Sequence, residues 1–290
     1  MMDAVTVKGL DKYMGRFRLK DINLSLRKGY ITGLIGENGS GKSTLIHHML
    51  TLKKQDEGRI SILDKDPELE REELLNTIGL VFAEDRFPQN LSPKKLNRLL
   101  NIYYINWHAD TFFAYLERFN VDATSKVKFL STGEKVKLSI AIALSHEAEL
   151  LILDEPTSNL DPTFRMELLD ILQTLMMDED ITILFSTHIT TDLEKIADYV
   201  VMIDDGEVLF DMDKDVLFES YRKVKGDRQI AADAGGLLIG TATNALGFEA
   251  MTKEPQALKE LYGEKVLIED LTMDEMMYFI KREKGETING

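Results

Sequence analysis

The segment Gly36–Thr44, Gly-Glu-Asn-Gly-Ser-Gly-Lys-Ser-Thr, constrains the fold of this chain more than any other part of it. Four residues separate Gly36 from Gly41, and Lys and Ser follow, which is the spacing of a phosphate-binding loop. A continuous apolar run, Tyr30 to Ile35, precedes the segment and is typical of a strand buried on both faces. A helical stretch follows, from Lys42 to about Leu52. This order predicts a strand, a turn and a helix that together bind phosphate.

Each residue type in the loop has a physical role in phosphate binding. Glycines allow positive φ and close approach of the backbone, and the turned N–H groups form a nest for anions. The helix that follows adds the positive end of its dipole. We expect Lys42 to reach the β- and γ-phosphates and Ser43 to hold Mg²⁺. The residues expected to bind the nucleotide are Gly36, Glu37, Asn38, Gly39, Ser40, Gly41, Lys42, Ser43 and Thr44.

A second candidate site follows the apolar run Leu150 to Leu153, where Asp154 and Glu155 come directly after four aliphatic residues. Two carboxylates in such a place are costly unless they serve a ligand. In open α/β sheets, ligands bind at the carboxyl ends of the strands. We expect Asp154 to hold Mg²⁺ and Glu155 to polarise a water molecule for in-line attack on the γ-phosphate.

The remaining pattern predicts an α/β protein with a phosphate-loop core. Alternating apolar residues from Val5 to Leu26 predict an N-terminal β-subdomain, which we expect to be antiparallel. Strands at 150–153, 181–185 and 200–203 alternate with helices, which predicts a mainly parallel sheet. Aromatic residues and leucines at helical spacing predict a helical insert over about 86–146.

A domain boundary is expected near residue 223, which gives a domain with the phosphate loop over 1–222 and a small α+β accessory domain over 223–290. Residues 223–236 are charged, then small and glycine-containing, without apolar periodicity. After them, the pattern predicts a hairpin over 237–251, a helix over 256–262, a strand over 265–268 and a final helix. Thr272 and Glu275 are spaced as a capping box for that helix.

Composition excludes several classes of protein. The chain has 290 residues and a formal net charge of −15, which argues against non-specific binding to nucleic acid. It has no cysteine, so disulfides, thiolate catalysis and cysteine-ligated metals are excluded. No run approaches the ~20 apolar residues of a membrane-spanning helix, and residues 1–10 lack the apolar core of a signal peptide. We therefore expect a protein that is soluble or held at a membrane by a partner.

A third motif suggests a family. Leu130-Ser131-Thr132-Gly133-Glu134 resembles the LSGGQ signature of the ATP-binding cassette (ABC) transporter family, and it precedes Asp154 by about 20 residues, as in that family. Thr132 and Glu134 depart from the pattern. The resemblance implies that Ser131 and Gly133, with Glu134 beside them, meet the γ-phosphate held by the other protomer of a head-to-tail dimer.

Smaller matches occur in the order of the same family. Ser158-Asn159-Leu160-Asp161 resembles the D-loop, whose Asp161 we expect at the nucleotide, and His188 resembles the switch histidine that contacts the γ-phosphate. Tyr13 lies where the family places an aromatic residue that stacks on adenine, with Phe17 as the alternative.

One family residue is missing. A glutamine that contacts Mg²⁺ usually follows the strand at 78–82, but here the chain reads Phe82-Ala83-Glu84-Asp85. Glu84 is the candidate substitute, since a carboxylate can also contact Mg²⁺ or its waters. The alternative is that Ala83 holds the aligned position and the contact is lost.

The resemblance, which spans about residues 3–220, implies the ATP-binding and ATP-hydrolysing subunit of an ABC transporter. It would use ATP and Mg²⁺, pair with itself or a second ATPase subunit, and drive a separate transmembrane permease from the cytoplasmic side of the membrane as a peripheral protein. The β-rich tail with its apolar last helix resembles small export-type subunits, which favours export. Two alternatives remain: a soluble ABC ATPase acting on nucleic acid or the ribosome, and a regulatory subunit with weak hydrolysis.

Overall fold

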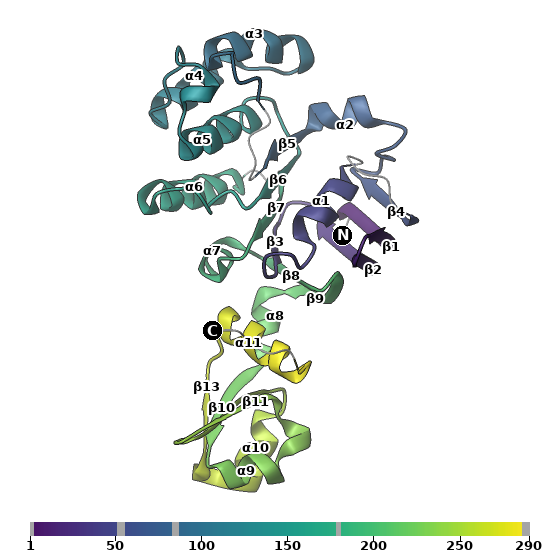
Figure 1. The fold of residues 1–290 in the computed structure, drawn as a ribbon, viewed down its shortest axis with the longest axis vertical. Coiled ribbons are helices and arrows are strands. Elements are labelled where there is room, and N and C mark those ends of the chain that lie inside the picture. The colour runs from purple at the N-terminus through teal and green to yellow at the C-terminus, as the bar shows by residue number, and fades with distance from the viewer. Residues whose placement is uncertain (1–2, 51–55, 83–86, 178–180, 286–290) are drawn as a thin grey trace. The chain divides into compact units, whose positions relative to one another are not determined.

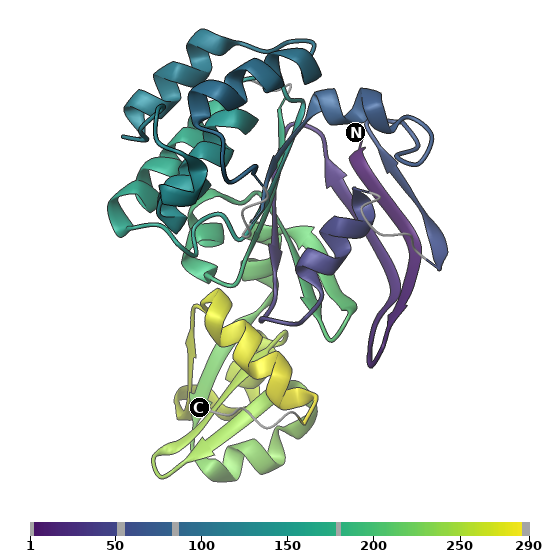
Figure 2. The ribbon, with the colours of Figure 1, turned by 45° about the horizontal axis from the view of Figure 1, so that its top comes forward.

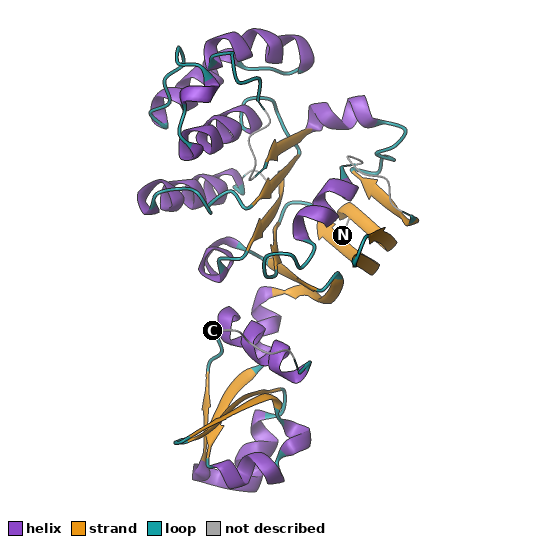
Figure 3. Cartoon of the chain, in the orientation of Figure 1, coloured by secondary structure: helices purple, strands orange, loops and turns teal. Residues whose placement is uncertain are grey.

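The computed structural model describes residues 3–50, 56–82, 87–177 and 181–285, and the chain divides into two compact units, Met1–Asp211 and Met212–Gly290. Glu84 lies outside the described residues. The first unit contains two sheets (Figures 1 and 3). An antiparallel sheet has the order β2-β1-β4, with β1 Asp3–Met14, β2 Phe17–Arg27 and β4 Glu57–Ile62.

The second sheet of this unit has the order β5-β6-β7-β3-β8-β9, and its pairs from β5 to β8 are parallel. Its strands are β3 Ile31–Ile35, β5 Ile78–Val81, β6 Leu150–Asp154, β7 Thr182–Thr187, β8 Tyr199–Asp204 and β9 Glu207–Asp213. Every residue of β3, β6 and β7 is buried, as expected for central parallel strands covered on both faces. The predicted α/β class with an antiparallel N-terminal sheet is therefore confirmed.

Helices cover both faces of the parallel sheet. α1 Lys42–Met49 lies on one face, and α6 Pro162–Leu175 and α7 Thr190–Ile196 lie on the other (Figures 1 and 2). A short helix, α2 Arg71–Thr77, leads into β5. The helical insert consists of α3 Pro93–Tyr103, α4 Ala109–Arg118, η1 Val127–Phe129 and α5 Thr132–Ala143.

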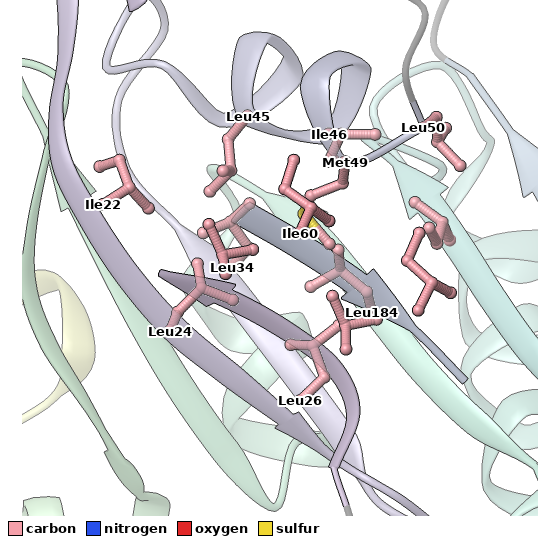
Figure 4. Packing of buried hydrophobic residues seen from close by; sticks show 14 of the residues in the cluster. Ile22, Leu24, Leu26, Leu34, Leu45, Ile46, Met49, Leu50, Ile60 and Leu184 are labelled. Carbon is pink, nitrogen blue, oxygen red and sulfur yellow. The ribbon is translucent and has the colours of Figure 1, made fainter. Parts of the chain in front are cut away.

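A buried apolar cluster holds α1 in place. Leu45, Ile46 and Met49 of α1 pack among residues of both sheets, including Leu24, Leu34, Ile60 and Leu184 (Figure 4). Burying each such side chain contributes about 1.5–3 kcal/mol relative to exposure. The cluster therefore anchors the helix whose first residue, Lys42, belongs to the predicted phosphate loop.

The second unit has one antiparallel sheet of order β11-β12-β10-β13 and its own apolar core. Its strands are β10 Arg222–Gly226, β11 Ile239–Asn244, β12 Gly247–Thr252 and β13 Val266–Glu269. Its helices are α8 Lys214–Ser220, α9 Arg228–Asp233, η2 Gly235–Leu237, α10 Pro255–Tyr262, η3 Gly263–Lys265 and α11 Met273–Glu283. The predicted hairpin, and the capping box of the last helix, are present.

The expected boundary and the observed division differ. The sequence places the boundary at 222/223, whereas the compact units divide at Asp211/Met212. The stretch in which the boundary was expected, 223–236, contains most of an inner strand, β10, and a helix, α9. Only one side chain of β10, Val224, is fully buried, so the strand lacks the apolar alternation by which strands are recognised.

Among the described residues, no helix combines the length and the apolar character needed to cross a membrane.

Candidate active site

The phosphate loop connects β3 to α1, as predicted from the sequence. Gly41 is the N-cap of α1 and has a φ of +116°, which L side chains rarely adopt. A Cβ at this position would lie 2.9 Å from Phe17 Cζ and 3.1 Å from Leu19 Cδ2. A side chain here would be strained by the positive φ and would have to displace the side-chain ends of Phe17 and Leu19. The N–H groups of the first turn of α1 have no acceptor within the helix, so they face outward as anion donors.

Lys42 is held inside the loop. Its side chain is 5% exposed, and Nζ donates to the carbonyl oxygens of Gly36 at 2.6 Å and Glu37 at 3.2 Å. Nζ also lies 3.2 Å from Oε1 of Glu155. The loop therefore wraps around a buried cation, and the carboxylate that follows β6 faces this cation, as the two sequence motifs together suggested.

The side chain of Glu155 contacts several residues of the site besides Lys42. Its Oε2 accepts hydrogen bonds from His188 Nδ1 at 2.7 Å and Ser158 Oγ at 2.9 Å. An ionised carboxylate only accepts, so Nδ1 of His188 carries the proton in this contact. Glu155 has a φ of +52°, an uncommon conformation for a residue with a side chain. Strained residues of this kind cluster at functional sites, where surrounding contacts over-determine them.

Asp154 lies at the end of β6 with 3% of its surface exposed, and its Oδ1 accepts a hydrogen bond from Ser186 Oγ at 2.9 Å. Ser43 is exposed in the first turn of α1. Hydroxyl and carboxylate oxygens are ligands that suit Mg²⁺. Among the residues the structure describes, no group of three or more His, Cys, Asp or Glu could hold a metal ion by itself. This donor set fits a cation that takes its other ligands from phosphates and water.

A cavity of about 370 Å³ lies beside the loop. Its walls combine apolar Met14 and Phe17 with the polar residues Glu37, Asn38, Gly39, Gly41, Lys42, Ser43, Thr44 and Glu155. Oε1 of Glu155 is buried there and accepts no hydrogen bond from the described part of the chain. Cations and hydroxyls suit phosphates, and apolar side chains suit a flat base. The residues present therefore fit a nucleotide.

The aromatic residues of the N-terminal sheet are placed differently. Phe17 lines the cavity, whereas Tyr13 does not belong to its walls. Tyr13 is 60% exposed, and its ring lies 4.4 Å from the guanidinium of Arg18, a cation–π contact. The hydrogen bond from that guanidinium holds the pKa of Asp11 below its usual range.

The signature-like segment forms the start of α5. Ser131 is its N-cap, and a capping box joins Ser131 to Glu134: Glu134 N donates to Ser131 Oγ, while Ser131 N donates to Glu134 Oε2 at 2.8 Å. A Cβ on Gly133 would lie 3.3 Å from the carbonyl oxygen of Asn159, so this turn packs closely on the Ser158–Asp161 segment. Ser131, Gly133 and Glu134 are not among the residues that line the cavity.

Asp161 is likewise outside the cavity walls and serves as the N-cap of α6. It accepts a hydrogen bond from Phe164 N at 3.0 Å, and this bond lowers the pKa of Asp161. Within this one chain, the structure brings together the phosphate loop, Asp154, Glu155 and His188. The signature-like segment and Asp161 form a second group, which lies outside the walls of the cavity.

Sequence reasoning assigned no role to three side chains of the site. Met14 lines the cavity, Ser158 bonds to Glu155, and Ser186 bonds to Asp154. Ser186 ends the apolar run of β7 two residues before His188, and that position was the available signal. Met14 carried no signal, because its place depends on how the β1–β2 turn folds over the loop.

Comparison with known proteins gives consistent similarities. A family model described as ABC transporter matches residues 19–158. The bacitracin transport ATP-binding protein BcrA of Bacillus licheniformis is 34% identical over 227 residues, which cover 77% of this chain and 74% of that protein. The lantibiotic transport ATP-binding protein SrtF of Streptococcus pyogenes is 33% identical over 216 residues, or 72% and 90% of the two chains. A solved ATP binding subunit of an ABC transporter superposes with a TM-score of 0.66 at 27% identity, covering 74% of this chain and 91% of that one.

Proposed function

This chain belongs to the ABC transporter family as an ATP-hydrolysing, ATP-binding subunit, and we propose that it drives a separate permease with Glu155 as the residue that activates water. The observation that carries this proposal is the contact of Glu155 with both Lys42 and His188 at the edge of the phosphate loop. Nucleophile activation and phosphate binding then occur within one group of side chains in contact, in which Glu155 forms an ion pair with Lys42 and a hydrogen bond with His188. Phosphoryl transfer needs this positioning and charge, and no covalent intermediate.

The roles of the side chains follow from their chemistry. Lys42 and the N–H groups of the first turn of α1 neutralise the phosphates. Glu155 orients and polarises the attacking water, and His188, whose Nδ1–H bonds Glu155, holds that carboxylate and presents its ring to the γ-phosphate. Ser43 and Asp154 would hold Mg²⁺, which supplies charge neutralisation at the β- and γ-phosphates. Phe17 is the aromatic wall for the base, because it lines the cavity and Tyr13 does not.

We further propose that two copies, or this subunit and a related one, bind ATP between them. The support is the position of Ser131, Gly133 and Glu134, which start a helix but lie outside the cavity walls of their own chain. A second chain placed head to tail would bring them to the phosphates. Glu134 retains the capping box that a glutamine would also make, so this departure changes charge and preserves the turn.

An exposed apolar surface supports a membrane partner. Large apolar side chains are exposed on α2, on α3 and in the segment after α3: Leu75, Leu99, Ile102, Tyr103 and Ile105. Asn76 ties the two regions together, since its Oδ1 accepts from Ile105 N at 2.9 Å. Exposed apolar patches mark interaction sites. We assign this surface to the permease, which would hold the subunit at the cytoplasmic side of the membrane as a peripheral protein.

Export is the direction we propose. The second unit, a small α+β domain that ends in a helix, resembles the tails of small export-type subunits. The relatives named above are described as transport proteins for bacitracin and for lantibiotics, which directs a search for cargo toward peptide antibiotics.

Glu155→Gln tests the proposed chemistry. The variant keeps the size of the side chain and one acceptor oxygen but cannot accept a proton, so we expect ATP hydrolysis to fall by roughly 10²–10³-fold. Binding of Mg-ATP should persist, and the variant should accumulate as an ATP-bound dimer. Steady-state phosphate release and size-exclusion chromatography with Mg-ATP measure the two effects.

Glu149→Gln is the matched control. Glu149 directly precedes β6, at the end opposite Glu155; it is half-exposed, and within the described part of the chain its carboxylate has one distant ion pair, to Lys28 at 3.9 Å. This control should hydrolyse ATP at the parental rate. Parental turnover by Glu155→Gln would overturn the assignment of Glu155. Recovery of tagged Glu155→Gln with ribosomes or nucleic acid, and without a membrane protein, would overturn the permease partner.

A further inference from the structure

Asp192, in the first turn of α7, is a buried carboxylate with no part in the chemistry described above. Its side chain is 2% exposed. Thr157 Oγ1 donates to its Oδ2 at 2.7 Å, and Arg165 donates to its Oδ1 through Nε at 2.8 Å, with Nη2 at 2.7 Å from the same oxygen. A carboxylate removed from water at this depth needs such partners, and here it has two hydrogen bonds and the charge of a guanidinium.

These donors come from segments next to the proposed catalytic residues. Thr157 lies two residues after Glu155, and Arg165 lies near the start of α6, just after the Ser158–Asp161 segment. Asp192 lies four residues after His188. The carboxylate therefore joins the loop that follows β6, and the start of α6, to the first turn of α7, which directly follows the loop that carries His188. Arg165 Nη2 strengthens this junction by donating to Thr191 Oγ1 at 3.1 Å.

The two joined loops carry the two ends of the 2.7 Å contact between His188 and Glu155. Two further contacts fix Glu155 itself: Ser158 Oγ, in the same loop, donates to its carboxylate, and Glu155 N donates to the carbonyl oxygen of Ser186 in β7. If the two loops separate, His188 and Glu155 separate with them. A displacement of about 1 Å in a reacting geometry can lower a rate by roughly 10²-fold.

We propose that Asp192 is a positioning residue for ATP hydrolysis, which acts by holding the Glu155 and His188 loops at their mutual distance through Thr157 and Arg165. The proposal rests on the roles proposed for Glu155 and His188. It assigns Asp192 no contact with nucleotide or water. Loss of its charge should therefore lower kcat and leave nucleotide affinity unchanged.

The fold provides a comparison within the same pair of helices. Lys195 of α7 pairs with Asp170 of α6 at 2.8 Å, where Asp170 is 65% exposed. This second ion pair also joins α6 to α7, but it lies away from both loops along the chain. If the Asp192 contacts only hold helices together, loss of either pair should have similar consequences for activity.

The experiment compares three variants of the full chain: Asp192→Asn, Thr157→Val and the control Asp170→Asn. Thr157→Val is nearly isosteric and removes only the hydroxyl that donates to Asp192. For Asp192→Asn and Thr157→Val we expect kcat for Mg-ATP to fall about tenfold or more, with the KM and the equilibrium Kd for ATP within about twofold of the parent. Asp170→Asn should retain parental kcat.

A second readout follows the geometry directly and does not depend on turnover. The Nδ1 signal of His188 in ¹⁵N NMR reports its hydrogen bond to Glu155. It should shift in Asp192→Asn and Thr157→Val and stay in place in Asp170→Asn, in protein whose circular dichroism matches the parent. Parental kcat in Thr157→Val with an unshifted His188 signal would overturn the proposal. If Glu155→Gln itself hydrolyses ATP normally, the assignment of Glu155 fails instead, while the NMR comparison still tests the junction.

Discussion

The backbone of Gly206 forms hydrogen bonds with both the phosphate loop and β2. It lies in the turn between β8 and β9 with a φ of +74°, and its N–H donates to the carbonyl oxygen of Ser40 in the phosphate loop at 2.9 Å. Its own carbonyl accepts from Lys20 N of β2 at 2.8 Å. A Cβ at this position would lie 1.9 Å from the carbonyl oxygen of Arg18. The turn can therefore keep its hydrogen bond to the phosphate loop only if residue 206 is glycine.

Gly206→Ala should destabilise the first unit by more than about 3 kcal/mol, because positive φ and a backbone collision act together. It should also weaken ATP binding, since the turn that holds Ser40 must move. Gly15→Ala is the control: Gly15 has a φ of +63° but open space around its Cβ direction, so roughly 1–2 kcal/mol is expected, with unchanged ATP affinity. Urea unfolding and nucleotide titration measure both effects. Equal losses in the two variants would contradict the collision.

At the scale of the element, β10 is an inner strand whose sequence does not show the alternation of several apolar residues with polar ones. Val224 faces the core of the second unit, and the opposite face carries Lys223 and Lys225. Lys223 pairs with Glu275 at 2.6 Å and Glu269 at 3.2 Å. Hydrogen bonds from Lys225 and Lys223 lower the pKa of Glu269. Burial raises the pKa of Glu275, but the hydrogen bonds from Lys223 and Thr272 outweigh burial and leave it lowered.

These pKa shifts predict an acid-dependent loss of order in the second unit. Carboxylates whose folded pKa lies below the unfolded value contribute stability that is present above about pH 4.5 and is lost as the pH falls through the folded pKa. Lys223→Met should flatten this dependence, because it removes a cation that both glutamates share. Hydrogen exchange of β10 and β13 amides, corrected for intrinsic pH effects, measures it from pH 6 down to about pH 3. Lys259→Met, which removes an exposed lysine of α10, should leave the profile unchanged.

At the scale of the whole molecule, the chain has two cores in two compact units, and the nucleotide residues all lie in the first. The single tryptophan, Trp107, lies between α3 and α4 of the first unit and is 9% exposed. Its indole N–H donates to Asn97 Oδ1 at 2.8 Å. Tryptophan fluorescence therefore reports unfolding of the first unit alone, whereas far-ultraviolet circular dichroism reports both.

Saturating ATP should stabilise only the transition that Trp107 reports. At a free ligand concentration of 100 times the Kd, the expected gain is about 2.7 kcal/mol. The transition that circular dichroism assigns to the second unit should not move, because a ligand stabilises only the cooperative unit that binds it. Lys42→Ala, which removes the buried phosphate-loop cation, should abolish the shift. Coincident transitions by both probes, moving together with ATP, would contradict independent unfolding.

Local signals explain what was predictable from the sequence. The phosphate loop, the acidic end of β6 and the Thr272–Glu275 capping box each depend on backbone geometry within a few residues, so spacing alone indicates them. The alternation of strands and helices then determined the α/β class, because parallel strands need helical crossovers. The order of the motifs along the chain carried the resemblance to the family, and with it ATP binding and hydrolysis.

Only the tertiary structure decided the contacts between distant segments. It placed Phe17 and Met14 on the cavity wall, brought His188 to Glu155, and buried Asp192 between Thr157 and Arg165. It also placed β10 inside its sheet, where the lysines of β10 form ion pairs with carboxylates of β12, β13 and α11. The free energy of each arrangement depends on desolvation and on partners far away in the chain, and neither is encoded in local spacing.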